Sequence, residues 1–433
     1  MSSDPVVLCV GLSHKTASLA ARERFALIGQ RARDLCAEVH AHHSVLEVVS
    51  VATCNRSEIY LLATDPEATT ALVVGALARF AQAQPEELST LLAVRSERAA
   101  VHHLLRVAAG AESVVVGEAE IQGQLKQALD AAHTNQTCGP VLDRLFRAAL
   151  ETGKRVRCDT GIGEGHASVG SVAARLVTER LGGLEDARIL VIGAGEMGAL
   201  VTRSLNAHGA GTIRIANRDG ARSARLAEQV GVEPTTLGQI VEELAWCDAV
   251  VTSTAAPHHI VTCERVAEAM QVRHNRPLVL VDLAVPRDVE SGVADMPGCH
   301  LFDLDDLERV VSSTMETRQA DLAQVERFVD AATEEFLVWR RQQEAVPAIV
   351  AMRNAAEQLR LREYERFAGK LTHLAAEDRQ RVEHLTRSLV NRLLHEPTIR
   401  LREAVSKEHA ADAPQGRWTQ AVQHLFGVEP SER

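Results

Sequence analysis

Residues 189–198 read Ile-Leu-Val-Ile-Gly-Ala-Gly-Glu-Met-Gly and decide the fold of the middle of the chain. The four apolar residues predict a short buried strand, and a helical pattern follows the glycines as far as Leu205. A Gly-x-Gly-x-x-Gly loop between strand and helix permits a tight turn and lets the backbone approach a pyrophosphate at the helix N-terminus. This context predicts a dinucleotide site formed by Gly193, Ala194, Gly195, Glu196, Met197 and Gly198.

Further strand-like runs alternate with helical patterns downstream of this loop, at residues 212–216, 249–254 and 278–283. Such alternation predicts a mainly parallel, doubly wound sheet of the Rossmann type, which binds ligands at the carboxyl ends of its strands. The loop 286–289 follows one of these ends. Its Arg287 could therefore contact a ligand, or it could cap the loop structurally.

The end of the second strand bears on the choice of nucleotide. An NAD enzyme usually places an acid there to bind the ribose hydroxyls, whereas an arginine suits the 2′-phosphate of NADP. Asn217 and Arg218 occupy this position and favour NADP. Asp219 follows them and could either bind the ribose or cap the next helix.

A second informative stretch is Thr53-Cys54-Asn55-Arg56, which follows an apolar run at residues 45–52. Another β-like run begins at Ile59, so the stretch should form a tight turn at a strand end. A thiolate is a nucleophile, and a neighbouring cation favours its formation. Arginine also binds carboxylates with two donors. We therefore interpret Cys54 either as a nucleophile beside the substrate anchor Arg56 or as a small apolar residue that fills the loop.

Residues 70–155 read as mostly helical, and within them segment 109–124 mixes glycines, acids, a serine and two glutamines around an apolar run. Glycines in such a segment let the backbone approach a ligand closely. Helical periodicity directs His103 toward the same cleft. It is a candidate acid–base group, and the alternative is a partly buried histidine bonded to the backbone.

Composition and cysteine spacing narrow the class of protein. The 433 residues are 46% hydrophobic, which suggests two or three globular domains, and the net charge of −11 requires a local basic face for any nucleic acid. Cys36 and His40 have the spacing of a metal-ligand pair, but no second pair follows, so we predict no metal site. Scattered cysteines, no secretory signal and no membrane-span pattern predict a cytoplasmic protein.

Helical patterns occur near the N-terminus and in the C-terminal part of the chain. A helix expected at residues 19–27 carries Arg22, Glu23 and Arg24, which we interpret as a solvated face. Residues 303–341 predict a long helix that acts as a strut, and helical patterns then continue to about Leu394. Residues 340–402 hold thirteen Lys and Arg against eight Asp and Glu, a basic surface for a phosphate backbone or simply another solvated face.

These motifs together resemble those of glutamyl-tRNA reductases, the NADPH enzymes that open the five-carbon route to tetrapyrroles. The similarity runs from residues 11–17 to residues 393–398, and Thr-Cys-Asn-Arg-Ser-Glu at 53–58 is its most specific part. The chain departs from the family pattern at Ala119-Glu120, where Pro-Gln is usual, at Gln122, where an aliphatic residue is usual, at Arg392, where Lys is common, and at Asp219, where a hydroxyl residue is usual.

The resemblance implies roles for individual residues. Cys54 would be the nucleophile that attacks the aminoacyl ester, and His103 would be the second catalytic residue. NADPH would be bound by the glycine loop together with Asn217 and Arg218. Arg56 would bind the carboxylate of the glutamyl group, which would be held by Thr53, Cys54, Asn55, Arg56, Ser113, Glu118, Ala119, Glu120 and Gln124.

The resemblance also implies an architecture. An N-terminal α+β catalytic domain that binds glutamyl-tRNA(Glu) would cover residues 1–157, and a Rossmann-type NADPH domain residues 158–302. A long spinal helix and an all-α dimerisation domain would cover residues 303–433, so that the protein forms a homodimer through its C-terminal helices. The product implied by the resemblance is glutamate-1-semialdehyde, and because it is labile, the aminomutase that uses it in the next step of the route is an expected partner.

Two rival interpretations remain at this stage. A shikimate-type NADP dehydrogenase would share the nucleotide domain and the Asn217-Arg218 turn, but it needs no thiol and has no long helical tail. A non-catalytic paralogue that binds tRNA or a partner would bind nucleotide without turnover.

Overall fold

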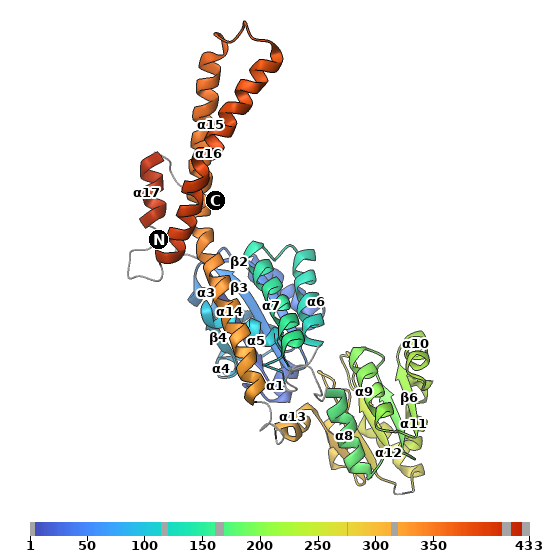
Figure 1. The fold of residues 1–433 in the computed structure, drawn as a ribbon. Helices are drawn as coiled ribbons and strands as arrows, with labels where there is room; N and C mark the ends of the chain where they lie inside the picture. Colours follow the sequence, from blue (N-terminus) through green and yellow to red (C-terminus); the bar gives the residue numbers. More distant parts are fainter. Residues whose placement is uncertain are drawn as a thin grey trace. The chain divides into compact units, whose positions relative to one another are not determined.

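The computed structural model describes residues 5–113, 120–160, 169–274, 276–312, 319–408 and 417–426. The chain divides into two compact units, Met1–Ala332 and Thr333–Arg433, and the division falls inside helix α14 (Gln319–Glu344). Both β-sheets belong to the first unit (Figure 1). The domain boundaries expected after residues 157 and 302 stay predictions, because this division falls at neither position.

The first sheet is antiparallel and lies near the N-terminus. Its four strands have the order β2-β3-β1-β4. All eight residues of β3, the strand that carries Arg56, are buried. Because neighbouring side chains point to opposite faces, both faces of this sheet must be covered. The strands are β1 (Val6–Ser13), β2 (Val45–Thr53), β3 (Arg56–Ala63) and β4 (Ala93–Ser96).

Helices cover the two faces of the first sheet. On one face, Val10 and Leu61 share a core with apolar residues of α2 (Gln30–His40), α3 (Pro66–Ala81) and α4 (Pro85–Ser89). On the other face, Tyr60 meets Phe146 edge-on, with ring centroids 5.6 Å apart. Phe146 belongs to α7 (Pro140–Asp159), which packs with α5 (Arg98–Ala108) and α6 (Glu120–Thr134). The expectation of mostly helical structure over 70–155 is confirmed for the described residues, with β4 as the exception.

The second sheet is the predicted doubly wound sheet. Six parallel strands have the order β10-β9-β8-β5-β6-β7. The strand order reverses between β5 and β8, which opens a crevice at their carboxyl ends. The strands are β5 (Arg188–Ile192), β6 (Thr212–Asn217), β7 (Glu233–Thr236), β8 (Ala249–Thr252), β9 (Leu278–Asp282) and β10 (Cys299–Phe302).

Two cores separate this sheet from its helices. Alternate residues of β5 belong to different cores, Ile189 to one and Leu190 to the other. The first core is shared with α8 (Val169–Leu181), α9 (Glu196–Ala207), α10 (Gly220–Val230) and α13 (Leu304–Ser312). The second is shared with α11 (Ile240–Trp246) and α12 (Cys263–Val272), and the short 3₁₀ turns are η2 (Leu237–Gln239) and η3 (Ser291–Asp295).

The predicted long helix is α14, which has 26 residues. Residues 313–318, between α13 and α14, lie outside the described ranges. The described helices of the second unit are the rest of α14, α15 (Val346–Ala368), α16 (Ala376–Glu408) and α17 (Arg417–Phe426).

The helical pattern that was expected to end near Leu394 continues to Glu408. Pro397 lies inside α16 and cannot donate a backbone hydrogen bond, which is costly for a helix interior. Leu401 and Val405, beyond the proline, are buried in a core with residues of α15. This burial offsets the cost of the proline, and sequence periodicity alone did not reveal it.

The interpretation of Arg22, Glu23 and Arg24 as a solvated face is wrong for the buried Arg22 and the partly buried Glu23, whereas Arg24 is exposed as expected. These residues lie on α1 (Leu19–Arg24), and each pairs with an oppositely charged residue. Arg22 is 2% exposed and pairs with Asp305, a residue 283 positions away. A local sequence pattern cannot reveal a partner at that separation.

Candidate active site

Cys54 lies in the predicted tight turn. Thr53 and Arg56 are paired at the ends of β2 and β3, so Cys54 and Asn55 are the two residues that connect these strands. The Asn55 N–H donates to Thr53 Oγ1 at 3.1 Å, and the His14 N–H donates to the Asn55 carbonyl at 2.9 Å. The turn is therefore fixed both by its own hydrogen bonds and by the loop that follows β1.

The carboxylate of Glu58 is the centre of a buried network beneath this turn. Glu58 Oε1 accepts from Arg56 Nη1 at 3.1 Å and lies 2.8 Å from His103 Nε2, and the Tyr60 hydroxyl donates to Oε2 at 2.8 Å. Arg56 and Glu58 are each 2% exposed, and His103 is 6% exposed. Because Arg56, Glu58 and Tyr60 alternate along β3, they point to one face of the sheet.

The network fixes the charge of Glu58 and the tautomer of His103. Burial opposes ionisation of Glu58, but the Arg56 guanidinium, His103 and the Tyr60 hydroxyl outweigh it and lower its pKa to about 2. Glu58 is thus ionised at neutral pH and can only accept hydrogen bonds. His103 Nε2 must therefore carry a proton, which leaves Nδ1 as the ring atom that is open to exchange.

Glu112 forms a second charged cluster that touches the first. Its side chain accepts from Lys15 Nζ at 2.6 Å and from Arg106 Nε at 2.8 Å, and its backbone carbonyl accepts from Arg56 Nη2. Burial raises the pKa of Glu112, but hydrogen bonds from Lys15 and Arg106 outweigh that effect and lower it to about 2. Arg56 is thus held between Glu58 and the chain at Glu112.

The structure brings Cys54, Asn55, Arg56 and His103 into one neighbourhood. Ser113 ends a described segment, Glu120 begins α6, and Glu118 and Ala119 lie outside the described residues. Gln124 lines a cavity of about 230 Å³ together with Ala52, two residues before Cys54.

The departure at Gln122 has a structural explanation. Its Nε2 donates to the carbonyls of Ala108 at 3.1 Å and Leu150 at 3.3 Å, and its Oε1 accepts from Arg157 at 2.8 Å. The amide therefore joins α5, α6 and α7. An aliphatic side chain could not make these bonds.

Cys54 also meets the nucleotide domain. Its side chain is partly buried and packs against the core that β5, α8 and α9 share. The thiol lies at the junction of the two domains.

The glycine loop has the geometry of a dinucleotide site. Gly193 has φ +117°, and a Cβ there would lie 2.7 Å from the Ser253 carbonyl oxygen. A Cβ at Gly198 would lie 1.9 Å from the Gly193 carbonyl oxygen, so only glycine lets α9 pack this close to the strand. At Gly195 a Cβ would meet no described atom within 4 Å, so this side of the loop is open.

Two further features of the loop fit an anionic group. Gly195 caps α9 without a side-chain hydrogen bond, so no capping side chain occupies the first N–H groups of the helix. Ser253 Oγ, beside the turn, is buried and has no hydrogen-bond partner within the described ranges. The residues present therefore suit a pyrophosphate.

The structure shows that Asp219 caps the next helix, one of the two roles considered for it. Its side chain accepts from the backbone N–H groups of Ala221 at 3.0 Å and Arg222 at 3.3 Å, which makes it the N-cap of α10. Asn217 donates through Nδ2 to the Asp219 carbonyl at 3.2 Å. Arg218 is exposed between them at the end of β6.

Two groups of side chains contain residues that could serve as metal ligands. Cys36 lines the cavity beside Gln124, whereas His40 Nε2 lies 3.3 Å from the Leu46 carbonyl oxygen, so the two make different contacts. Cys9, Glu58 and His103 bring ligand atoms within 4.8 Å of one another. The Arg56 guanidinium already neutralises Glu58, and burial raises the pKa of the Cys9 thiol, so this group suits a hydrogen-bond network better than a cation.

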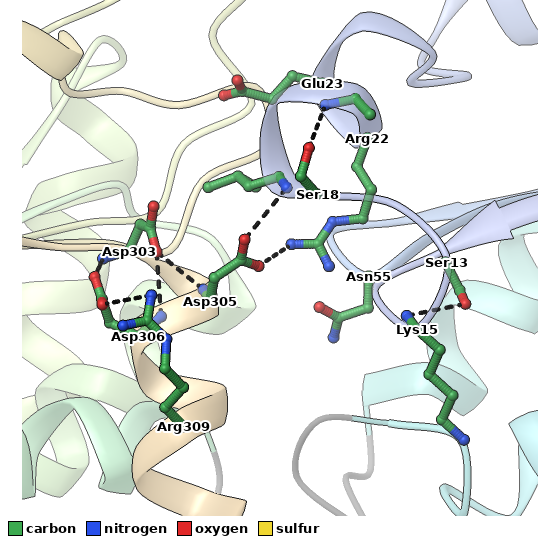
Figure 2. A network of polar contacts seen from close by, with 12 residues as sticks. Ser13, Lys15, Ser18, Arg22, Glu23, Asn55, Asp303, Asp305, Asp306 and Arg309 are labelled. Atoms are coloured by element: carbon green, nitrogen blue, oxygen red, sulfur yellow. Dashed lines mark hydrogen bonds and ion pairs between the residues drawn. The ribbon is translucent and has the colours of Figure 1, made fainter. Parts of the chain in front are cut away.

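Two features escaped the sequence analysis. Glu58 belongs to the motif at residues 53–58, but no role was predicted for it. Its alternation with Arg56 and Tyr60 along a strand indicates that the three side chains share one face of the sheet. The second feature is the junction in Figure 2, where Arg22 reaches from α1 to Asp305 on α13. Arg287, for which ligand contact and a structural role were both open, pairs with Glu23.

Comparisons with known proteins cover nearly the whole chain. Residues 10–160 match the glutamyl-tRNA reductase N-terminal domain, residues 175–310 match shikimate/quinate 5-dehydrogenase, and residues 324–428 match the glutamyl-tRNA reductase dimerisation domain. Glutamyl-tRNA reductase of Rubrobacter xylanophilus is 39% identical over 95% of each chain. That of Chloroflexus aurantiacus is 40% identical over 97% of this chain and 98% of the relative. The solved glutamyl-tRNA reductase of Methanopyrus kandleri is 30% identical over 99% of each chain, with a TM-score of 0.49.

A doubly wound dinucleotide domain, joined in one chain to a domain whose cysteine turn packs against it, defines a nucleotide-dependent oxidoreductase. The full-length relatives make the class more specific: the chain belongs to the glutamyl-tRNA reductase family. The predicted family, fold class and enzyme class are thereby confirmed, and the match at residues 324–428 supports a homodimer. None of the described helices combines the length and the apolar character that a membrane span requires.

Substitution of Glu58 tests the buried network. Because the folded-state pKa is about 2, below the ordinary value of 4.5, Glu58 contributes stability above pH 4.5 that is lost as the pH falls toward 2. We expect Glu58→Gln to lower the free energy of unfolding at pH 7 by about 3 kcal/mol, because Arg56 loses its buried partner. The difference from the unchanged protein should narrow as the pH falls to about 3.

Urea unfolding at pH 7 and pH 3 provides the measurement. Glu87→Gln is the matched control, because it removes an acid of similar type from a half-exposed pair with Arg24. A stability difference for Glu58→Gln that is the same at both pH values would contradict the assignment of Glu58 as a buried carboxylate.

Proposed function

We propose that the protein reduces glutamyl-tRNA(Glu) to glutamate-1-semialdehyde with NADPH through a thioester on Cys54, in the first step of the five-carbon tetrapyrrole route. The observation that carries the proposal is the packing of Cys54, in its turn, against the core of the dinucleotide domain. A nucleophile and a hydride donor must share one substrate carbonyl, and a thiol at the junction of their domains meets that requirement.

Cys54 acts as the nucleophile. Its thiolate sulfur attacks the carbonyl carbon of the aminoacyl ester, a C–S bond forms, and the C–O bond to the terminal ribose breaks. The released ribose oxygen takes up a proton, and the glutamyl group stays on the enzyme as a thioester. The nicotinamide, when bound, supplies the hydride that reduces this thioester carbonyl to an aldehyde. Cys54 leaves as the thiolate and is ready for the next turnover.

Arg56 and Asn55 hold the glutamyl group. A guanidinium has five N–H donors, so the contacts of Arg56 with Glu58 and the Glu112 carbonyl leave donors for a substrate carboxylate. Asn55 is 5% exposed, and its Oδ1 has no hydrogen-bond partner in the described structure, so this buried acceptor suits the substrate ammonium group. The remaining proposed contacts are Thr53, Ser113, Glu118, Ala119, Glu120 and Gln124.

His103 is the proposed acid–base residue. Its Nε2 proton is committed to Glu58, so exchange with the substrate or leaving group uses Nδ1. The fixed ring also lies on the wall of a cavity of about 710 Å³ that Arg106 and Glu112 help to form. Glu58 thus orients His103 in the same manner as it orients Arg56.

The nucleotide domain is proposed to prefer NADPH. Asp219 uses Oδ1 of its carboxylate to cap α10, which commits this oxygen to the helix and not to the ribose hydroxyls. Arg218 is exposed at the strand end where the ribose lies in folds of this kind, and a guanidinium suits a 2′-phosphate. The Gly193–Gly198 loop would receive the pyrophosphate.

Assembly and partners follow from the second unit and from the product. On α16, Leu385, Leu389 and Leu393 recur every four residues and are 58%, 52% and 73% exposed. A stripe of this kind is costly in water, and a second copy of the dimerisation domain would cover it. The semialdehyde is reactive, so the aminomutase that consumes it is the proposed recipient.

Arg218→Ala tests the nucleotide preference. Loss of a charge-assisted contact to the 2′-phosphate should raise the KM for NADPH by about tenfold or more and leave the KM for NADH nearly unchanged. Arg222→Ala, an exposed arginine on α10, is the matched control. Equal effects of Arg218→Ala on both nucleotides would contradict the assignment.

Cys54→Ser and Cys54→Ala test the proposed function. Both variants should still bind NADPH, because the glycine loop is unchanged, whereas semialdehyde formation from glutamyl-tRNA should fall by at least about a thousandfold. Cys158→Ala, an exposed cysteine at the end of α7, is the control and should retain activity. Full reductase activity in Cys54→Ser would exclude the thioester route.

The same assay separates the rivals. Reduction of a small keto acid without any need for tRNA would favour a shikimate-type dehydrogenase, whose family description matches residues 175–310 alone. Nucleotide binding by the unchanged protein without turnover of glutamyl-tRNA would favour a non-catalytic paralogue.

A further inference from the structure

Two neighbouring residues of α1 form ion pairs of opposite polarity with the nucleotide domain. Arg22 Nη2 donates to Asp305 Oδ1 at 2.6 Å (Figure 2). Glu23 accepts from Arg287, with its Oε2 2.8 Å from Nη2. Asp305 lies in the first turn of α13, and Arg287 lies in the loop after β9. We call these four residues the crossed pairs.

Each acid of the crossed pairs uses both of its oxygens. Asp305 Oδ2 accepts from the Leu19 N–H at 3.3 Å, in addition to the bond from Arg22. Glu23 Oε1 accepts from the Arg287 N–H at 2.6 Å and from its Nε at 2.9 Å. The crossed pairs therefore join backbone as well as side chains of the two domains.

The polarity of the crossed pairs selects one alignment of the domains. A shift of α1 by one position in one direction would bring Arg22 toward Arg287, and a shift in the other direction would bring Glu23 toward Asp305, so either shift places like charges together. A single ion pair would fix only a distance. Two pairs with reversed charges also fix the direction in which α1 lies across the nucleotide domain.

On the catalytic side, α1 is rigidly connected to the cysteine turn. Ser13, the last residue of β1, pairs with Arg56, the first residue of β3. The next residue, His14, donates its N–H to the Asn55 carbonyl at 2.9 Å. Ser18, five residues after Ser13, is the N-cap of α1. A displacement of α1 would therefore be transmitted to the turn that holds Cys54.

On the nucleotide side, buried carboxylates fix the loop of Arg287. Asp288 accepts from the Thr254 N–H at 2.8 Å, and Asp282 Oδ2 accepts from the Val289 N–H at 2.8 Å. Asp282 and Asp288 are 1% and 0% exposed. Thr254 follows β8, the neighbour of β5, which leads into the glycine loop. The position of Arg287 is thus tied to the strand ends beside the glycine loop.

We propose that Arg22, Glu23, Arg287 and Asp305 are positioning residues that hold the Cys54 thioester in reach of the nicotinamide during hydride transfer. The inference rests on the proposed function. The crossed pairs act through other groups, because their described contacts are with each other and with backbone. Acylation of Cys54 needs only the catalytic domain, whereas reduction needs the catalytic and nucleotide domains to be correctly aligned with each other. Loss of a crossed pair should therefore affect reduction selectively.

The pair Glu23–Arg287 is the better one to alter. Arg22 has a side chain that is only 3% exposed, and its Nε and Nη1 are buried without partners in the described structure, so its replacement risks misfolding. Glu23 and Arg287 are 16% and 26% exposed. The variants are Glu23→Gln, Arg287→Gln and the exchanged pair Glu23→Arg with Arg287→Glu.

The experiment measures two steps separately in the full-length protein with charged glutamyl-tRNA. Acylation of Cys54 is followed without nucleotide by acid quench, and reduction by single turnover after NADPH is added. Each single variant should acylate within about twofold of the unchanged protein and reduce about tenfold more slowly or worse, since a displacement near 1 Å can cost about a hundredfold. The exchanged pair should reduce at least about threefold faster than either single variant.

Arg24→Gln is the matched control. Arg24 lies on the same helix and pairs with Glu87 at 2.6 Å, but both residues belong to the catalytic domain. It should leave both steps nearly unchanged. Equal loss of acylation and reduction in the single variants, unchanged reduction in them, or an exchanged pair no faster than either single variant would each overturn the proposal. Failure of the unchanged protein to acylate Cys54 would instead overturn the proposed function.

Discussion

The site depends on one buried carboxylate. Glu58 lies between Arg56, Tyr60 and His103, and its charge is stable there only because all three partners stabilise it. The same charge dictates that Arg56 is held and that His103 carries its proton on Nε2. A single acid on a central strand thus sets the position of a substrate anchor and the protonation of a candidate acid–base group. The cysteine turn is built directly on the end of that strand.

The division of labour between the domains follows from their two kinds of sheet. In the antiparallel sheet, β2 and β3 are connected by a two-residue turn that contains Cys54. In the parallel sheet, β5 is followed by the glycine loop. The open side of this loop lies at the crevice where the strand order reverses. Neither sheet provides both a nucleophile and a dinucleotide site. Chemistry that needs both must take place where the domains meet, and Cys54 packs at that junction.

Local chemistry was readable from the sequence, and distant pairing was not. The glycine loop and the cysteine turn depend on residues within a few positions, so their patterns were sufficient for prediction, and the local pattern offered the cap at Asp219 as one of two alternatives. Arg22 was misread because its partner Asp305 is 283 positions away. The extension of α16 past Pro397 was missed for the same reason, since its burial comes from another helix. The proposed roles of the substrate residues remain predictions.

The most direct test of the account uses the unchanged protein and charged glutamyl-tRNA, with acid quench and mass spectrometry of the peptide that carries Cys54. Without NADPH, the account predicts a glutamyl adduct on Cys54. With NADPH, the adduct should disappear as glutamate-1-semialdehyde forms. Semialdehyde formation with no adduct on Cys54 at any time, or an adduct that persists when NADPH is bound, would contradict the central claim that this thiol passes the glutamyl group to the nicotinamide.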